Sequence, residues 1–247
     1  MTDGLLINAF FGSSSESHQC VGLRLNSLDN LCEVGLEEKK LMTLKTTHAL
    51  SGTVIAFFFI FHLMNHLVGI IGVDAHIQLM ETLRTVYRNT VVESVLMCAL
   101  SFQIFSGVKF AFSGWKTRKG IIPWVQASSG LYLAFFFLNH VGSVMAGRYI
   151  MQLDTNYYFA IAGIHVAPFQ YFFIPYYFIA IVAVFAHMGC GLFWPLHKVS
   201  SRLARHMIVF MVVMGFVCSL LVTMAMSGTF YSIEVPDEYK TTYQLSR

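Results

Sequence analysis

Long apolar runs alternate with short polar segments along most of the chain, and this pattern predicts helices that span a membrane. The apolar runs that are long enough to cross about 30 Å of hydrocarbon cover residues 47–72, 91–114, 121–146, 169–195 and 206–228. Only helices and closed barrels satisfy their backbone hydrogen bonds in lipid, and these runs lack the two-residue alternation of a barrel. The pattern therefore predicts an all-α membrane protein with five transmembrane helices in a bundle.

Composition agrees with this fold class. Of the 247 residues, 56% are hydrophobic and 12% are charged, and the mean hydropathy is +0.62. Soluble domains carry about a quarter charged residues, so the composition favours lipid as the solvent. The net charge of +3 is too small to indicate a nucleic-acid partner. The five cysteines form no Cys-x-x-Cys pair, which argues against an iron–sulfur or zinc site in this chain and against a disulfide framework.

Charged residues outside the runs predict the orientation in the membrane. Lysines and arginines concentrate on one side of the predicted bundle, which is the cytoplasmic side by the positive-inside rule. We therefore expect a cytoplasmic N-terminal segment (1–46), a transmembrane domain (47–228) and a C-terminal tail outside (229–247). The cytoplasmic side would carry Arg24, Lys39, Lys40, Lys45, Lys116, Arg118, Lys119, Lys198, Arg202 and Arg205, and the outer side Arg84, Arg88, Arg148, Lys240 and Arg247.

An internal repeat with an offset of 78 residues relates the first and third spans. Residues 47–62 read THALSGTVIAFFFIFH and residues 125–140 read VQASSGLYLAFFFLNH, with eight of sixteen positions identical. Both spans run in the same direction, since one span lies between them. Matching positions therefore lie at similar depth, and His62 and His140 are expected together in the outer half of the membrane.

Each repeat also has a glycine ten residues before its histidine, Gly52 in the first and Gly130 in the second. At about 100° per residue, each glycine lies within roughly 80° of its histidine on the helix surface. Glycine weakens a helix. The matched pair therefore indicates a close approach, either of another helix or of a flat cofactor.

A histidine inside a membrane is costly unless it is paired or bound to a metal. We interpret His62 and His140 as axial ligands of one haem iron, which leaves no open coordination position and favours electron transfer over oxygen chemistry. The alternative for each histidine is a hydrogen bond to a neighbouring helix. Zinc would require two more ligands, and only His66 lies nearby. We interpret His66 as an interfacial residue or one that supports the ligands.

A weaker repeat relates the second and fourth spans, where QIFSGV (103–108) aligns with HMGCGL (187–192). It places Gln103 opposite His187, on the cytoplasmic side, and the second span contains no histidine. A glutamine amide is a weak iron ligand compared with imidazole. We therefore expect one haem, and a second haem with an unusual ligand set stays open. His48 is the remaining candidate, either as a ligand or as a polar contact to haem propionate or quinone.

These motifs together resemble the cytochrome b subunit of five-helix succinate dehydrogenases and fumarate reductases. The resemblance covers nearly the whole chain. It is carried by LLINAFFGSS near the N-terminus, TTHALSG and FH on the first span, WVQASSG and NH on the third, and IPYYF and AHMGCGL on the fourth.

The resemblance implies a membrane anchor in the inner (cytoplasmic) membrane of the cell that does not itself convert the dicarboxylate. Such a subunit docks an iron–sulfur subunit, which carries a flavoprotein, and electrons pass between the clusters, haem b and quinone. FAD and iron–sulfur clusters would belong only to these partner subunits. The implied ligands are His62 with His140 for one haem, and His187 without its usual partner for a second.

The same resemblance suggests further site residues. Gln126, Ser128 and Trp124 would lie near haem propionates, with ordinary capping and interface anchoring as the alternative. Glu81, a carboxylate before the second span, is a candidate for quinol chemistry beside His48. Whether succinate is oxidised or fumarate reduced depends on the quinone and on the partner subunits, so it stays open here.

Other functions also remain open at this point. One is the cytochrome b subunit of another quinone-linked enzyme, a hydrogenase or formate dehydrogenase, whose catalytic partner lies on the outer side. A second is a transporter in which His62, His66 and His140 relay protons, although transporters usually contain inverted repeats and this repeat is parallel. A third is a structural anchor without haem.

Overall fold

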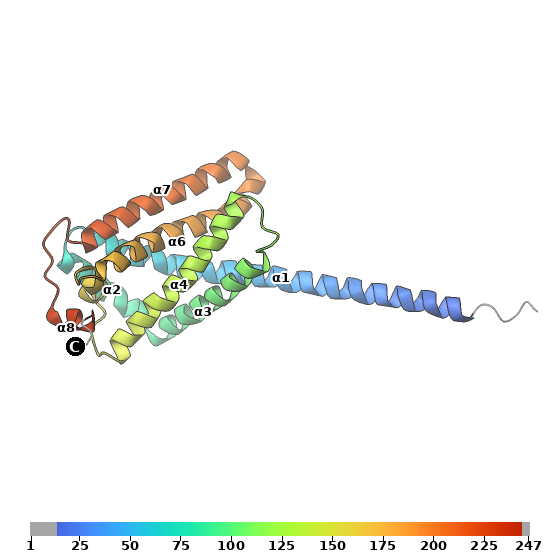
Figure 1. Ribbon diagram of the computed structural model, residues 1–247, viewed down its shortest axis with the longest axis horizontal. Helices are drawn as coiled ribbons and strands as arrows, with labels where there is room; N and C mark the ends of the chain where they lie inside the picture. Colours follow the sequence, from blue (N-terminus) through green and yellow to red (C-terminus); the bar gives the residue numbers. More distant parts are fainter. Residues whose placement is uncertain (1–13, 244–247) are drawn as a thin grey trace, which may run out of the picture. The chain divides into compact units, whose positions relative to one another are not determined.

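The computed structural model describes residues 14–243, and within them the chain is helical, with no strand. All but the last residue of LLINAFFGSS, and the last four residues of the predicted C-terminal tail, lie outside the described residues. The elements shown in Figure 1 are α1 (Ser14–Val68), α2 (Val73–Tyr87), α3 (Thr90–Ser113), α4 (Ile121–Tyr149), α5 (Tyr157–Ile161), the 3-10 helix η1 (Ala162–Ile164), α6 (Gln170–Val199), α7 (Ser201–Met226), α8 (Asp237–Lys240) and the 3-10 helix η2 (Thr241–Tyr243).

Contacts divide the chain into two units, Met1–Ala49 and Leu50–Arg247, and α1 contributes residues to both. The boundary lies close to the predicted end of the N-terminal segment at residue 46. The first unit contains His48, which is partly exposed. The second unit contains every other candidate site residue, and the site is described within it.

Five helical segments are long and apolar enough to cross a membrane, as the hydrophobic pattern predicts. They are Leu36–Val68, within α1, and the whole of α3, α4, α6 and α7. The first segment starts before the predicted residue 47 and ends before the predicted residue 72. Large apolar side chains such as Phe57, Phe105 and Phe172 lie exposed on these helices. Since soluble proteins rarely expose such large apolar surfaces, lipid is the solvent that fits them.

Within the second unit, α6 and α7 form the closest pair, α4 packs on α6, and α3 packs on α4 (Figure 1). The α3–α4 connection lies at one end of this bundle. At the other end lie α2, α5, η1 and α8, and we call it the α2 end (Figure 1). The turn between α6 and α7 is short because Ser200 caps α7 directly, its side chain accepting a hydrogen bond from the Leu203 amide at 3.3 Å.

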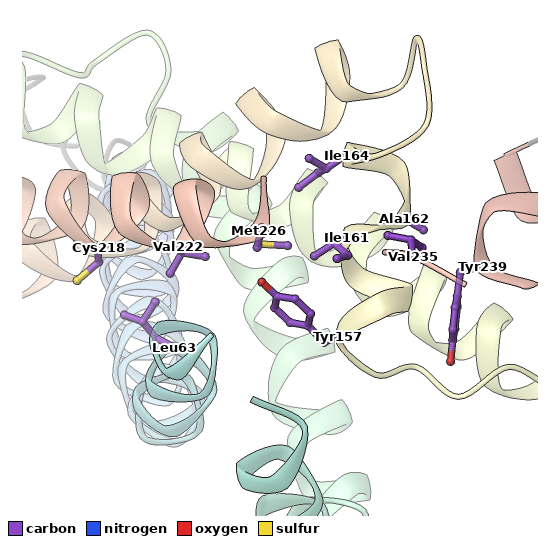
Figure 2. Packing of buried hydrophobic residues seen from close by; sticks show 10 residues of the cluster. All are labelled: Leu63, Tyr157, Ile161, Ala162, Ile164, Cys218, Val222, Met226, Val235 and Tyr239. Carbon is purple, nitrogen blue, oxygen red and sulfur yellow. The ribbon is translucent and has the colours of Figure 1, made fainter. Parts of the chain in front are cut away.

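The helices at the α2 end were not predicted from the hydrophobic pattern. In α2 the buried residues are His76, Met80 and Arg84, which share one face because they recur every four residues. A helix with so few apolar positions is too short and too polar to be recognised as a span. Its partner is a core that joins α1, α5 and α7, in which Tyr157 and Ile161 are fully buried (Figure 2).

Candidate haem-ligand pair and the histidines beside it

His62 on α1 and His140 on α4 face each other inside the bundle. Their ring centroids are 6.1 Å apart and the ring planes meet at 72°. Each imidazole stacks on the phenylalanine four residues before it, Phe58 at 5.4 Å and Phe136 at 5.1 Å. Because these phenylalanines are equivalent in the repeat, both halves orient their histidine in the same way. Neither imidazole makes a hydrogen bond to residues 36–243.

This spacing fits one metal ion held between the two rings. Metal–imidazole bonds are about 2 Å long, so two axial imidazoles place their ring centres about 6 Å apart. The observed 6.1 Å agrees with that arrangement. In the described part of the chain, no group of three or more His, Cys, Asp or Glu side chains could hold a metal ion. Two imidazoles alone suit a haem iron, whose other four ligands come from the macrocycle.

Two more histidines continue from His62 toward the α2 end. His66 lies edge-on to His62 with centroids 4.7 Å apart, and His76 on α2 lies 5.2 Å from His66. The Asn65 amide donates a hydrogen bond of 3.0 Å to His76 Nε2. Burial, together with the neighbouring His62 and Arg84, lowers the pKa of His76 to about 4. His76 is therefore uncharged at neutral pH.

The sequence pattern indicated that His66 is interfacial or supports the ligands. It indicated no role for Asn65 or His76. The four-residue spacing of His62 and His66, one helical turn, is visible in the sequence. His76 was missed because it reaches this cluster only where α2 folds back against α1, a contact that the hydrophobic pattern does not encode.

On the second and fourth spans, Gln103 and His187 occupy equivalent places, each against a glycine of a neighbouring helix. A Cβ added to Gly52 would lie 2.8 Å from Gln103 Nε2, and one added to Gly130 would lie 2.9 Å from His187 Cε1. The sequence predicts a close approach at both glycines by a helix or a flat cofactor. In each case the approaching group is one polar side chain of another helix.

Hydrogen bonds hold both of these side chains. Gln103 Nε2 donates to Ser51 Oγ at 3.0 Å. His187 Nδ1 donates to the Gln126 carbonyl at 3.0 Å and lies 3.3 Å from Ser129 Oγ. Within residues 50–243, no second histidine ring lies against His187. In this unit His187 therefore lacks the facing imidazole that His62 has in His140.

The residues predicted near haem propionates have separate partners. Gln126 Oε1 accepts a hydrogen bond of 3.1 Å from Trp194 Nε1. Ser128 Oγ donates to a carbonyl of its own helix at 3.3 Å, and Trp124 packs edge-on against Trp115 with centroids 5.1 Å apart.

Glu81, the predicted carboxylate for quinol chemistry, takes part in an ion-pair network. Its carboxylate lies 2.6 Å from Arg84 Nη1, and Arg84 Nη2 lies 2.8 Å from Asp154. Burial opposes the charge of Arg84, but the hydrogen bond and charge of Asp154 outweigh it and raise the pKa of Arg84. Arg84 thereby ties α2 to the loop after α4, and Glu81 flanks it from a half-exposed position.

No family model, no curated protein and no solved structure matches this chain. The function is therefore inferred from the residues and their geometry.

Proposed function

We propose that this chain is the membrane-anchor cytochrome b subunit of a succinate dehydrogenase or fumarate reductase complex. It passes electrons between an iron–sulfur subunit and quinone. The observation that carries the proposal is the pair of facing imidazoles, His62 and His140, 6.1 Å apart inside a bundle of five candidate spans. The motifs that resemble this family supply the biological context.

In this proposal His62 and His140 would hold haem b through its iron. The haem would supply a one-electron carrier when bound. Phe58 and Phe136 keep the imidazoles in orientation by stacking on them. The apolar helices around the pair exclude water from it.

The proposal includes one haem. Gln103 offers only an amide, a weak ligand, and it is engaged with Ser51. His187 Nδ1 donates to the Gln126 carbonyl, and His187 faces no second imidazole within residues 50–243. Hydrogen-bonded Gln103 and His187 therefore occupy the positions where a second pair of haem ligands would be expected.

The proposed orientation follows the distribution of basic residues. Lys116, Lys119 and Lys198 lie at the end of the bundle opposite α2, in the α3–α4 connection and the last turn of α6. The positive-inside rule places this end in the cytoplasm. The iron–sulfur subunit would dock there, with the flavoprotein beyond it, and the α2 end would face outward.

The test is the visible spectrum of the purified full-length chain, together with a pyridine haemochrome assay. We expect a reduced α-band typical of haem b and one haem per chain. Under mild detergent, a flavoprotein and an iron–sulfur protein should copurify. A chain produced in cells with ample haem and purified without any haem would refute the proposal.

The chain of four neighbouring histidines favours one alternative, a transporter in which His62, His66 and His140 relay protons. The parallel direction of the repeat speaks against it, since transporter repeats are commonly inverted. The same spectrum separates the two functions. Copurifying partners separate the proposed complex from a hydrogenase or formate dehydrogenase.

A further inference from the structure

An open pocket of about 520 Å³ lies at the α2 end, where the turn between α1 and α2 meets the segment that follows α7. It is lined by residues 71–75, by residues 231–234 and by Tyr158 of α5. None of the four neighbouring histidines described above lines it. The pocket is therefore separate from the candidate haem-ligand pair and the cluster beside it.

The pocket opens just beyond the ends of two candidate spans. The first span ends at Val68 and the last at Met226, and the pocket begins a few residues later in each case, with Ile71 and Tyr231. Polar head groups add about 5–7 Å to each side of the hydrocarbon core. Ile71 is 77% exposed, and such an apolar side chain fits contact with lipid better than contact with water. The pocket therefore opens at the depth of the lipid head groups.

Two carboxylates of the pocket lack an ionic partner. Asp74, in the first turn of α2, and Glu234 are both exposed, and neither forms an ion pair with a described residue. Four other carboxylates at this end each pair with an arginine or a lysine, namely Glu81, Glu93, Asp154 and Asp237. The pocket thus has a negative charge that no residue of the described chain balances, and a cationic ligand would neutralise it.

The rest of the lining favours an organic ammonium group over a metal ion. Tyr158 and Tyr231 line the pocket, and the faces of aromatic rings attract ammonium groups. A primary ammonium also has three N–H donors for carboxylate oxygens. The described residues contain no group of three His, Cys, Asp or Glu that could hold a metal ion. The volume is also larger than one bare ion needs.

The same pocket offers donors for an anion. Residues 73–75 form the first turn of α2, where backbone amides have no acceptor within their own helix. Gly72, which precedes α2, supplies no side-chain hydrogen bond to them. These amides and the positive end of the helix dipole suit a phosphate group, and Ser232 adds a hydroxyl to the lining. An ammonium site next to a phosphate site is the pattern that a zwitterionic head group requires.

We propose that this pocket binds the head group of phosphatidylethanolamine. Asp74 and Glu234 accept hydrogen bonds from the ammonium group, which lies against the rings of the two tyrosines. The amides of the first turn of α2 donate to the phosphate, and the acyl chains pass Ile71 toward the hydrocarbon core. A lipid fits better than a soluble amine because the pocket lies at head-group depth. The site requires neither haem nor quinone, so it goes beyond the proposed function and does not depend on it.

The test uses the full-length chain, delipidated in detergent, and native mass spectrometry. The probes are the palmitoyl-oleoyl forms of phosphatidylethanolamine, phosphatidylcholine and phosphatidylglycerol. We expect the tightest adduct to be phosphatidylethanolamine, bound roughly fivefold or more tightly than the other two, because only its ammonium group donates N–H bonds to the carboxylates.

A double variant, Asp74→Asn with Glu234→Gln, removes both charges with little change of shape and should abolish this preference. The matched control is Asp237→Asn with Glu238→Gln. It makes the same change of charge on α8, at the same end of the bundle and outside the pocket lining, and should keep the preference.

A reversal of charge gives a readout that a misfolded chain cannot produce. Glu234→Lys should weaken the binding of phosphatidylethanolamine and strengthen that of the anionic phosphatidylglycerol. Putrescine added at the concentration of the lipid distinguishes a soluble amine from a lipid head group, and we expect it to leave the lipid bound. Equal affinity for the three lipids, an unchanged preference in the double variant, or displacement by putrescine would overturn the proposal. Haem absorption of the same samples tests the proposed function separately.

Discussion

The pair His62–His140 and the pair Gln103–His187 are built from the two internal repeats, but they end in different chemistry. At the first pair, each repeat contributes an imidazole that stacks on a phenylalanine and makes no hydrogen bond to residues 36–243. At the second, Gln103 and His187 lie against the repeat glycines and are held by hydrogen bonds.

This difference shows how one residue type separates a candidate metal site from a structural contact. The surroundings of Gln103 and His187 are alike, since each lies against a repeat glycine of a neighbouring helix. Two imidazoles facing each other can hold an iron between them, whereas an amide that bonds a neighbouring serine cannot supply an equivalent ligand. The comparison predicts that changes at these few positions decide the haem content.

The largest expected effect is the loss of haem from the first pair. His62→Ala or His140→Ala should abolish the low-spin spectrum, because one of the two facing imidazoles is removed. Visible absorption and electron paramagnetic resonance measure the change, with His197→Ala as the control. If both single variants keep a full bis-imidazole spectrum, the assignment of the ligands is wrong.

The reverse change should be possible at the second pair. Gln103→His introduces an imidazole at the position that the repeat aligns with His187, and the haem content in the pyridine haemochrome assay should rise from about one haem per chain toward two. A rise requires His187, so the double variant Gln103→His with His187→Ala should stay near one. An unchanged haem content in Gln103→His would show that more than the ligand type separates the two pairs.

The histidine cluster beside the first pair should also make the stability depend on pH, through His76. The Gln103 amide at the second pair does not titrate. The folded-state pKa of His76, about 4, lies below its ordinary value of 6.5, so the unfolded chain binds the proton more tightly. The contribution of neutral His76 to the free energy of unfolding is about 3 kcal/mol at most. It is fully present above pH 6.5 and is lost as the pH falls toward 4.

Unfolding midpoints in detergent at pH 7, 5.5 and 4.5 measure this effect. Carboxylates titrate in the same range, so the informative quantity is the difference between the wild-type chain and His76→Gln, which has no titrating ring. Identical pH dependence in the two chains would contradict the burial of a neutral His76.

The smallest expected effect distinguishes the two glycines. Gly130→Ala should destabilise the bundle by about 1–3 kcal/mol, because the added methyl group meets the His187 ring. Gly52→Ala should cost less than about 1 kcal/mol, because the Gln103 amide is the end of a flexible side chain and can move. Gly142→Ala, where nothing lies within 4 Å of the added atom, is the control. Thermal unfolding in detergent measures all three, and equal losses at Gly52 and Gly130 would contradict the comparison.

The sequence alone predicted five helices that are long and apolar enough to cross a membrane, because this requires only local properties, the length and apolarity of one segment. The repeat also placed His62 and His140 opposite each other, since parallel spans with matching residues share the same depth. Haem ligation by this pair stays a prediction for the spectrum to test. The repeat likewise marked Gly52 and Gly130 as points of close approach.

Only the tertiary structure showed what meets at those points. The partners of the glycines, Gln103 and His187, come from other helices, and helix packing selects them. The α2 end was likewise beyond the sequence, because a short amphipathic helix has no unique partner until the spans assemble. Where α2 folds back, the hydrogen bond between Asn65 and His76 joins residues eleven positions apart, and the position of this buried pair depends on the packing of α1, α2 and α5 together.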